Sequence, residues 1–83
     1  MAMVPTVSHP TNRPNFTLVD TGSVELAFSY DTCVGFRARG SGWVVHENVW
    51  GPTTGKHLNW LSEDKARRVP GVEFDRLVAS AVA

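Results

Sequence analysis

The sequence predicts an α+β fold, in which an antiparallel meander of three or four strands is followed by two helices packed on one face. Three observations favour this fold. Large apolar residues occupy every second position over residues 24–30, which is the period of a strand with one buried face. The period changes at Pro52, which cannot donate a hydrogen bond to a β-ladder. Residues 72–81 then carry one apolar stripe at helical spacing.

A single small domain is expected, because chains of 83 residues are rarely divided between two domains. Residues 1–14 contain three prolines and no periodic apolar pattern, so we expect a flexible, extended amino-terminal arm there. Residues 15–83 then form the α+β domain. Small domains depend on their few large side chains for stability, so at least two of the three tryptophans should be buried.

The strands are expected at residues 16–19, 24–30, 33–39 and 43–49. In the third of them Val34 and Phe36 should share one face, and Gly35 marks a bulge or a close approach of another chain segment. The fourth has apolar residues on both sides, so its phase is ambiguous. We favour as its inward side Trp43, Val45, Glu47 and Val49.

A short helix should follow Pro52, with Thr53 or Thr54 as its cap, because hydroxyl side chains accept hydrogen bonds from the first free amides of a helix. Its inward residues would be Leu58 and Leu61. A last helix over about 72–81 should bury the stripe formed by Phe74, Leu77, Val78 and Ala81.

Composition excludes several classes of protein. Eight basic residues balance eight acidic ones, so no global charge attracts the chain to nucleic acid or to an anionic membrane. Cys33 is the only cysteine, which excludes an internal disulfide and the common multi-cysteine zinc patterns. The sequence contains no apolar run long enough for a transmembrane helix and no signal peptide. We therefore expect a cytoplasmic protein without a metal or another cofactor.

Two segments carry a resemblance to a known family: Ser29-Tyr30-Asp31-Thr32-Cys33-Val34-Gly35-Phe36 and Trp50-Gly51-Pro52-Thr53-Thr54-Gly55-Lys56-His57. They are similar to small proteins of bacteriophages and other mobile elements, in which an S-Y-x-T-x-V-x-F strand pair precedes a W-x-x-T-T-x-x-H helix start. The similarity extends from residue 24 to about residue 78. Gly35 and Gly51 depart from it, because members usually carry Ala and Ser there. The resemblance implies a viral or prophage origin and no established biochemical activity.

The helix start offers a candidate anion site formed by Thr53, Thr54, Lys56 and His57. Free backbone amides and the positive end of the helix dipole attract anions, and a lysine adds a charge-assisted contact. The segment is not a phosphate-binding loop of nucleotide hydrolases, because its Gly-Lys pair is followed by His57 and its glycines are too close together. The alternative is architectural: a threonine caps the helix, and His57 turns inward to satisfy a buried backbone group.

A second candidate is an interaction surface that includes Arg37, Arg39, His46 and Trp50. Guanidinium groups contact phosphates and tryptophan stacks on bases, so this face could bind nucleic acid. The alternatives are a solvated outer face, or pairing with a second copy of the chain as a homodimer. Zero net charge favours these alternatives.

Catalysis by Cys33 with His46 or His57 has no support in the spacing of these residues, and cysteine is commonly buried and inert. We therefore expect no catalytic residues and no enzymatic activity. The function expected from the sequence is that of a small phage-type accessory protein, which binds a host or phage protein or another macromolecule in the infected cell. The alternative is a protein that binds a nucleotide or another phosphorylated ligand around residues 53–57.

Overall fold

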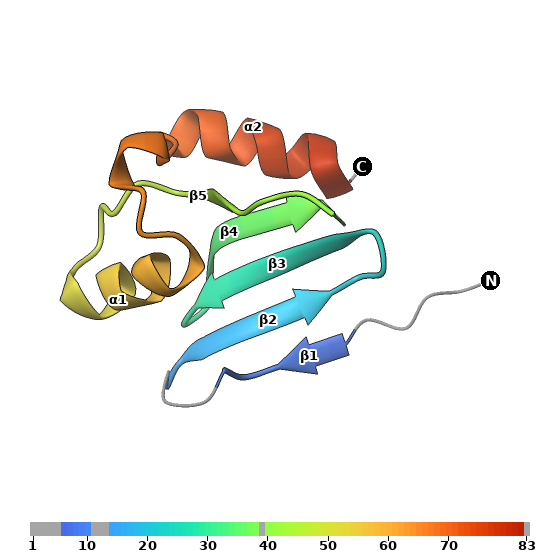
Figure 1. The fold of residues 1–83 in the computed structure, drawn as a ribbon, viewed down its shortest axis with the longest axis horizontal. Coiled ribbons are helices and arrows are strands. Elements are labelled where there is room, and N and C mark those ends of the chain that lie inside the picture. The colour runs from blue at the N-terminus through green and yellow to red at the C-terminus, as the bar shows by residue number, and fades with distance from the viewer. Residues whose placement is uncertain (1–5, 11–13, 39, 83) are drawn as a thin grey trace.

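The computed structural model describes residues 6–10, 14–38 and 40–82, which form a five-stranded antiparallel sheet followed by two α-helices (Figure 1). The strands are β1 (Thr6–Ser8), β2 (Phe16–Asp20), β3 (Val24–Ser29), β4 (Thr32–Ala38) and β5 (Val44–Val45), in that order across the sheet. They are followed by α1 (Pro52–Leu61), a short 3₁₀ helix (Lys65–Arg67) and α2 (Gly71–Val82). The α+β class is thereby confirmed.

The sheet has one strand more than the largest number expected from the sequence. The additional strand is β1, whose Val7 pairs with Val19 of β2. It lies in the stretch 1–14 that was expected to form an arm, where residues 1–5 and 11–13 lie outside the described part of the chain. A three-residue edge strand between prolines is too short to leave a periodic pattern in the sequence.

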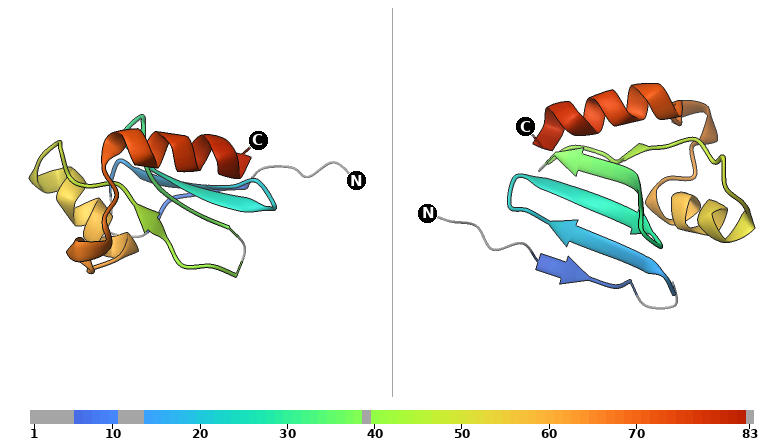
Figure 2. Two further views of the ribbon diagram at one scale, coloured as in Figure 1. Left: turned by 90° about the horizontal axis from the view of Figure 1, so that it is seen from above. Right: turned by 180° about the vertical axis from the view of Figure 1, so that it is seen from behind.

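The two helices cover opposite faces of the sheet, so the expectation that both pack on one face is wrong (Figure 2). On one face Leu58 and Leu61 of α1 pack against a cluster formed by Phe16, Ala27, Val34 and Val45. On the other face Phe74 of α2 packs against Val24 and Phe36. Central strands with apolar residues on both faces need a cover on each side to exclude water from the core.

The chain crosses from one face to the other along the edge of β5. The Val69 N–H donates to the carbonyl of Val45 at 2.9 Å, and the Glu47 N–H donates to the carbonyl of Val69 at 2.9 Å. These bonds form a parallel bridge between His46 and Val69. The segment between the helices thus extends the sheet edge before Pro70-Gly71 begins α2 on the far side.

A bulge in β4 places Val34 and Phe36 on opposite faces, which corrects the expectation that they share one. Ala27 pairs with Gly35 and Phe28 pairs with Cys33, so Val34 is an extra residue on β4. An extra residue reverses the alternation of side chains beyond it. The close approach expected at Gly35 is confirmed, because a Cβ atom there would lie 2.7 Å from Cδ1 of Leu61.

The fourth expected strand is much shorter than 43–49. Only Val44–Val45 are in β5, and the favoured inward side holds for Trp43 and Val45 but not for Glu47 and Val49, which are exposed. The alternation ends because the chain leaves β4 and bridges to Val69 at His46.

Helix α1 begins earlier than the threonines suggested. Gly51 is its N-cap residue without a side-chain cap, Pro52 is the first helical residue, and Thr53 and Thr54 lie within the first turn. Proline is favoured at that position because the first amides of a helix have no intrahelical partner. Leu58 and Leu61 face inward as predicted. The predicted stripe of α2 is also confirmed: Phe74 forms a cluster with Val24 and Phe36, and Leu77, Val78 and Ala81 pack against that cluster.

Candidate functional site

A buried polar network joins α1 to the end of β3 and to the segment before β2. The Ser29 hydroxyl lies 3.0 Å from Oγ1 of Thr54 and 2.7 Å from Nδ1 of His57. Nε2 of His57 lies 3.1 Å from the carbonyl oxygen of Pro14. The His57 side chain is 2% exposed, and Ser29 and Thr54 are also buried. Three segments far apart in the sequence therefore meet at one imidazole.

The chemistry of the partners assigns the protons. The Pro14 carbonyl can only accept a hydrogen bond, so Nε2 of His57 carries the proton and donates it. In the neutral ring Nδ1 is then an acceptor, and the Ser29 hydroxyl donates to it. Thr54 in turn donates its hydroxyl proton to Ser29. Each polar atom of the network has a partner, which makes its burial favourable.

Contacts with two aromatic rings also position the imidazole. The ring of His57 stacks on Phe16, with centroids 4.8 Å apart and planes 9° from parallel. The Tyr30 ring lies at 6.4 Å from it on another side. His57 therefore acts as a core residue with two polar atoms.

A small cavity of about 80 Å³ opens above this network. It is lined by Ser29, Tyr30, Thr32, Val34, Trp50 and Thr54. Two of the lining side chains are large aromatics that reach solvent: Tyr30 is 54% exposed and Trp50 is 43% exposed. We call this feature the Tyr30–Trp50 pocket. Its lining combines the hydroxyls of the buried network with two aromatic side chains that reach solvent.

The backbone holds Tyr30 in an unusual conformation. Tyr30 lies in the two-residue connection between Ser29 and Thr32, and its φ of 55° is in the left-handed region that bulky residues rarely adopt. Its N–H donates to the carbonyl of Asn15 at 2.7 Å, and Asn15 also has a positive φ, 61°. Such conformations cost on the order of 1–3 kcal/mol and cluster at functional sites.

The indole of Trp50 packs against the ring of His46, which packs in turn against the ring of Phe74 of α2. The ring centroids lie 4.6 Å apart in the first pair and 5.0 Å apart in the second. Nδ1 of the buried His46 donates to the carbonyl of Glu47 at 2.6 Å. Oδ1 of Asn48 accepts a hydrogen bond from the backbone N–H of Trp50 at 3.0 Å. The indole is thus positioned by the core rather than by a free loop.

The candidate anion residues divide into two pairs. Thr54 and His57 are buried and make the hydrogen bonds of the network, whereas Thr53 and Lys56 lie on the exposed side of α1. His57 turns inward as in the architectural alternative, but its backbone partner is the carbonyl of the exposed Pro14, and the N-cap residue of α1 is a glycine, not a threonine.

The predicted interaction surface does not form one group. Arg37 lies on the face of the sheet that α1 covers in part, where its Nε donates to Oε1 of Glu25 at 2.7 Å and its guanidinium stacks over Trp43 at 4.8 Å. Arg39 lies outside the described part of the chain. His46 is buried under Trp50, which reaches solvent beside the Tyr30–Trp50 pocket. Arg37 instead lines a different cavity and is already paired with Glu25.

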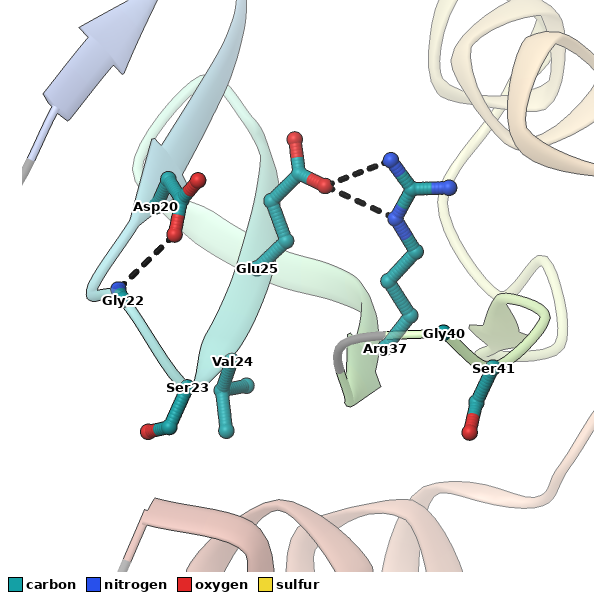
Figure 3. Close-up of a pocket in the computed structure, with 8 residues that line it drawn as sticks. All are labelled: Asp20, Gly22, Ser23, Val24, Glu25, Arg37, Gly40 and Ser41. Atoms are coloured by element: carbon teal, nitrogen blue, oxygen red, sulfur yellow. Dashed lines mark hydrogen bonds and ion pairs between the residues drawn. The ribbon is translucent and has the colours of Figure 1, made fainter.

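A cavity of about 530 Å³ lies beside Arg37 (Figure 3). Its charged groups already interact with partners inside the protein. Glu25 is paired with Arg37, and Oδ1 of Asp20 accepts from the Gly22 N–H at 2.8 Å. The Asp20 contact closes the turn between β2 and β3, and the ion pair links β3 to β4.

Cys33 lies on the α2 side of the sheet, away from His57 on the α1 side. Burial raises the pKa of the Cys33 thiol above its ordinary value, which disfavours the reactive thiolate. Within residues 6–10, 14–38 and 40–82, no group of three or more His, Cys, Asp or Glu side chains is placed to hold a metal ion. No helix in these ranges is long and apolar enough to cross a bilayer.

Sequence reasoning missed Ser29 and Tyr30 as site residues, although both stand in the motif that carried the resemblance. It also expected two buried tryptophans, whereas Trp50 and Trp60 are each 43% exposed and Trp43 is half-buried. Phe16, Leu58 and Phe74 fill the core instead, because smaller side chains fit the space between a sheet and a short helix.

No curated protein and no solved structure matches the chain. The profile of a family of unknown function matches residues 6–76, a region that runs from β1 into α2 and includes the whole buried network and the Tyr30–Trp50 pocket. The chain therefore belongs to this family, DUF8033.

Proposed function

We propose that the chain is a small, non-enzymatic accessory protein of phage type that binds a host or phage protein in the cytoplasm of the infected cell. The Tyr30–Trp50 pocket is the proposed docking site. The observation that carries the proposal is the exposure of Tyr30 and Trp50 beside a cavity, on a backbone held by the buried network.

Tyrosine and tryptophan are the side chains that most often dominate the binding energy of protein interfaces. Here the backbone of Tyr30 is held by the bond between its N–H and the carbonyl of Asn15, and the indole of Trp50 packs against the imidazole of His46. An aromatic side chain that is already packed loses little conformational entropy when a partner binds. The cavity between them has room for one small apolar side chain of that partner.

The surroundings of the pocket favour a protein over a phosphorylated ligand or a nucleic acid. The exposed carboxylate of Asp31 directly follows Tyr30 and would repel phosphate groups. Thr54 and His57 already make hydrogen bonds within the protein, which leaves Thr53 and Lys56 for the alternative anion site at the start of α1. The equal numbers of acidic and basic residues also supply no attraction to nucleic acid.

The proposal predicts that a photoreactive phenylalanine derivative at position 30 forms a specific covalent adduct with a protein in infected cells. The same group at Val72, which is 88% exposed on α2, should not form that adduct. The mass of the adduct identifies the partner, and an adduct of twice the chain mass reveals a homodimer instead.

Affinity for the identified partner should then fall by at least tenfold in Trp50→Ala, consistent with a side chain that dominates an interface. Trp60→Ala is the matched control, since Trp60 has the same residue type and the same exposed fraction but lies on α1, where its ring packs edge-on against Phe16. Equal loss in both variants, or an adduct from position 72 alone, would contradict the proposed docking site.

A further inference from the structure

Another cleft, separate from the Tyr30–Trp50 pocket and from the cavity beside Arg37, lies at the edge of the sheet. It is formed by β5, by α2 and by the segment that connects α1 to α2. Its volume is about 410 Å³. Trp43, Val69 and Leu77 provide apolar walls, and Arg67 and Arg68 provide two guanidinium groups. The cleft therefore combines positive charge with an apolar interior.

The guanidinium of Arg68 is held in a fixed orientation by hydrogen bonds at one of its nitrogens. Nη2 donates to Oδ1 of Asn59 at 2.7 Å and to the carbonyl of Ser62 at 3.1 Å. Nε is shut off from solvent and has no acceptor among the described residues. A buried donor without a partner is unfavourable. An oxyanion in the cleft would stabilise the positive charge that this guanidinium carries.

The charges around the cleft do not cancel. Asp64 is the acidic residue in its lining, against Arg67 and Arg68. One oxygen of Asp64 already accepts from the Ala66 N–H at 3.2 Å, where it caps the 3₁₀ helix. A net positive cleft with planar donor groups matches the charge and the geometry of an oxyanion.

We propose that this cleft binds a small oxyanion carried by a flat apolar group, either a phosphate ester or a carboxylate. The oxyanion lies against the guanidinium groups of Arg67 and Arg68, and the apolar group lies against Trp43 and Leu77. This site goes beyond the proposed protein docking function and does not depend on it.

The test measures binding of phenyl phosphate and of benzoate to the full chain by calorimetry. Two control compounds each supply half of the proposed ligand: inorganic phosphate has the oxyanion without an aryl group, and benzyl alcohol has the aryl group without an oxyanion. At least one of the two aryl anions should bind at least tenfold more tightly than either half. Comparison of phenyl phosphate with benzoate distinguishes the two sources of the oxyanion. Failure of both aryl anions to exceed the half ligands would overturn the proposal.

Two arginine variants locate the binding. Arg67→Ala should weaken it by at least tenfold, because the exposed Arg67 lines the cleft and can be removed without loss of a buried contact. Arg76→Ala removes the same charge from an exposed ion pair with Glu73 on α2 and should change the affinity by less than twofold. Equal effects of the two variants, or retained binding in Arg67→Ala, would overturn the site.

A spectroscopic readout reports on Arg68 without mutation, since its replacement would also break the contacts with Asn59 and Ser62. In a ¹H–¹⁵N spectrum of arginine side chains, the Nε–H resonance of Arg68 should shift when the aryl anion is added. The resonance of Arg37, whose Nε is already paired with Glu25, should stay in place. A shift of Arg37 with none at Arg68 would place the ligand elsewhere and overturn the proposal.

Discussion

His57→Ala is expected to destabilise the protein by about 3–5 kcal/mol, a large part of the stability of a domain of this size. The substitution removes a ring that stacks on Phe16 and leaves a cavity in the core. It also removes the buried bond between the imidazole and the Ser29 hydroxyl, a loss that costs about 1–3 kcal/mol. Thermal unfolding followed by circular dichroism should show a midpoint lowered by more than about 12 °C.

Lys56→Ala is the matched control for this measurement. Lys56 precedes His57 on the same helix and is exposed, so its removal should change the free energy of unfolding by less than about 0.5 kcal/mol. If His57→Ala unfolds at the same temperature as Lys56→Ala, the imidazole does not hold the fold together.

Phe74→Ala is expected to cost a further large share of stability, about 3–5 kcal/mol. The Phe74 side chain is 1% exposed and attaches α2 to the sheet through Phe36, at a centroid distance of 5.8 Å. It also supports the ring of His46 beneath Trp50. Denaturant unfolding should show the loss, and hydrogen exchange should show faster exchange along α2.

The control for Phe74→Ala is Val72→Ala on the same helix. Val72 is among the most exposed apolar residues of the protein, so its truncation should leave the unfolding midpoint within about 0.5 kcal/mol of the wild type. Similar losses in both variants would mean that α2 is not attached through Phe74.

The sequence predicted those helices and strands in which apolar residues recur at a regular spacing. The strand β3 and the stripe of α2 appear where they were expected. The single buried face expected for β3 is wrong, because Ala27 and Ser29 on its other face are also buried and Tyr30 is exposed. The sequence could not show that the sheet is covered on both faces. The segment with the 3₁₀ helix leads the chain around the edge of β5, and this path depends on backbone hydrogen bonds rather than on side-chain pattern.

The candidate site was predicted in part. The motif located Thr54 and His57, and the inward turn of His57 was stated from the sequence as one alternative, although its backbone partner, the Pro14 carbonyl, belongs to an exposed residue. Ser29 was not recognised, because a serine at the end of a strand is usually exposed to solvent. It is buried here because α1 folds back over the end of β3, a tertiary contact that local pattern does not reveal. Tyr30 was missed for a related reason, since its left-handed backbone is not typical of tyrosine.

Chemical unfolding of Thr54→Val beside Thr53→Val tests whether the buried network holds the start of α1. The two threonines are neighbours in the first turn of α1, so the substitutions have the same effect on helix propensity. Only Thr54 donates to Ser29 in the buried network. Thr54→Val should lower the free energy of unfolding by about 1–2 kcal/mol, whereas Thr53→Val should change it by less than about 0.5 kcal/mol. Equal effects, or a larger effect of Thr53→Val, would show that the start of α1 is not held by this network.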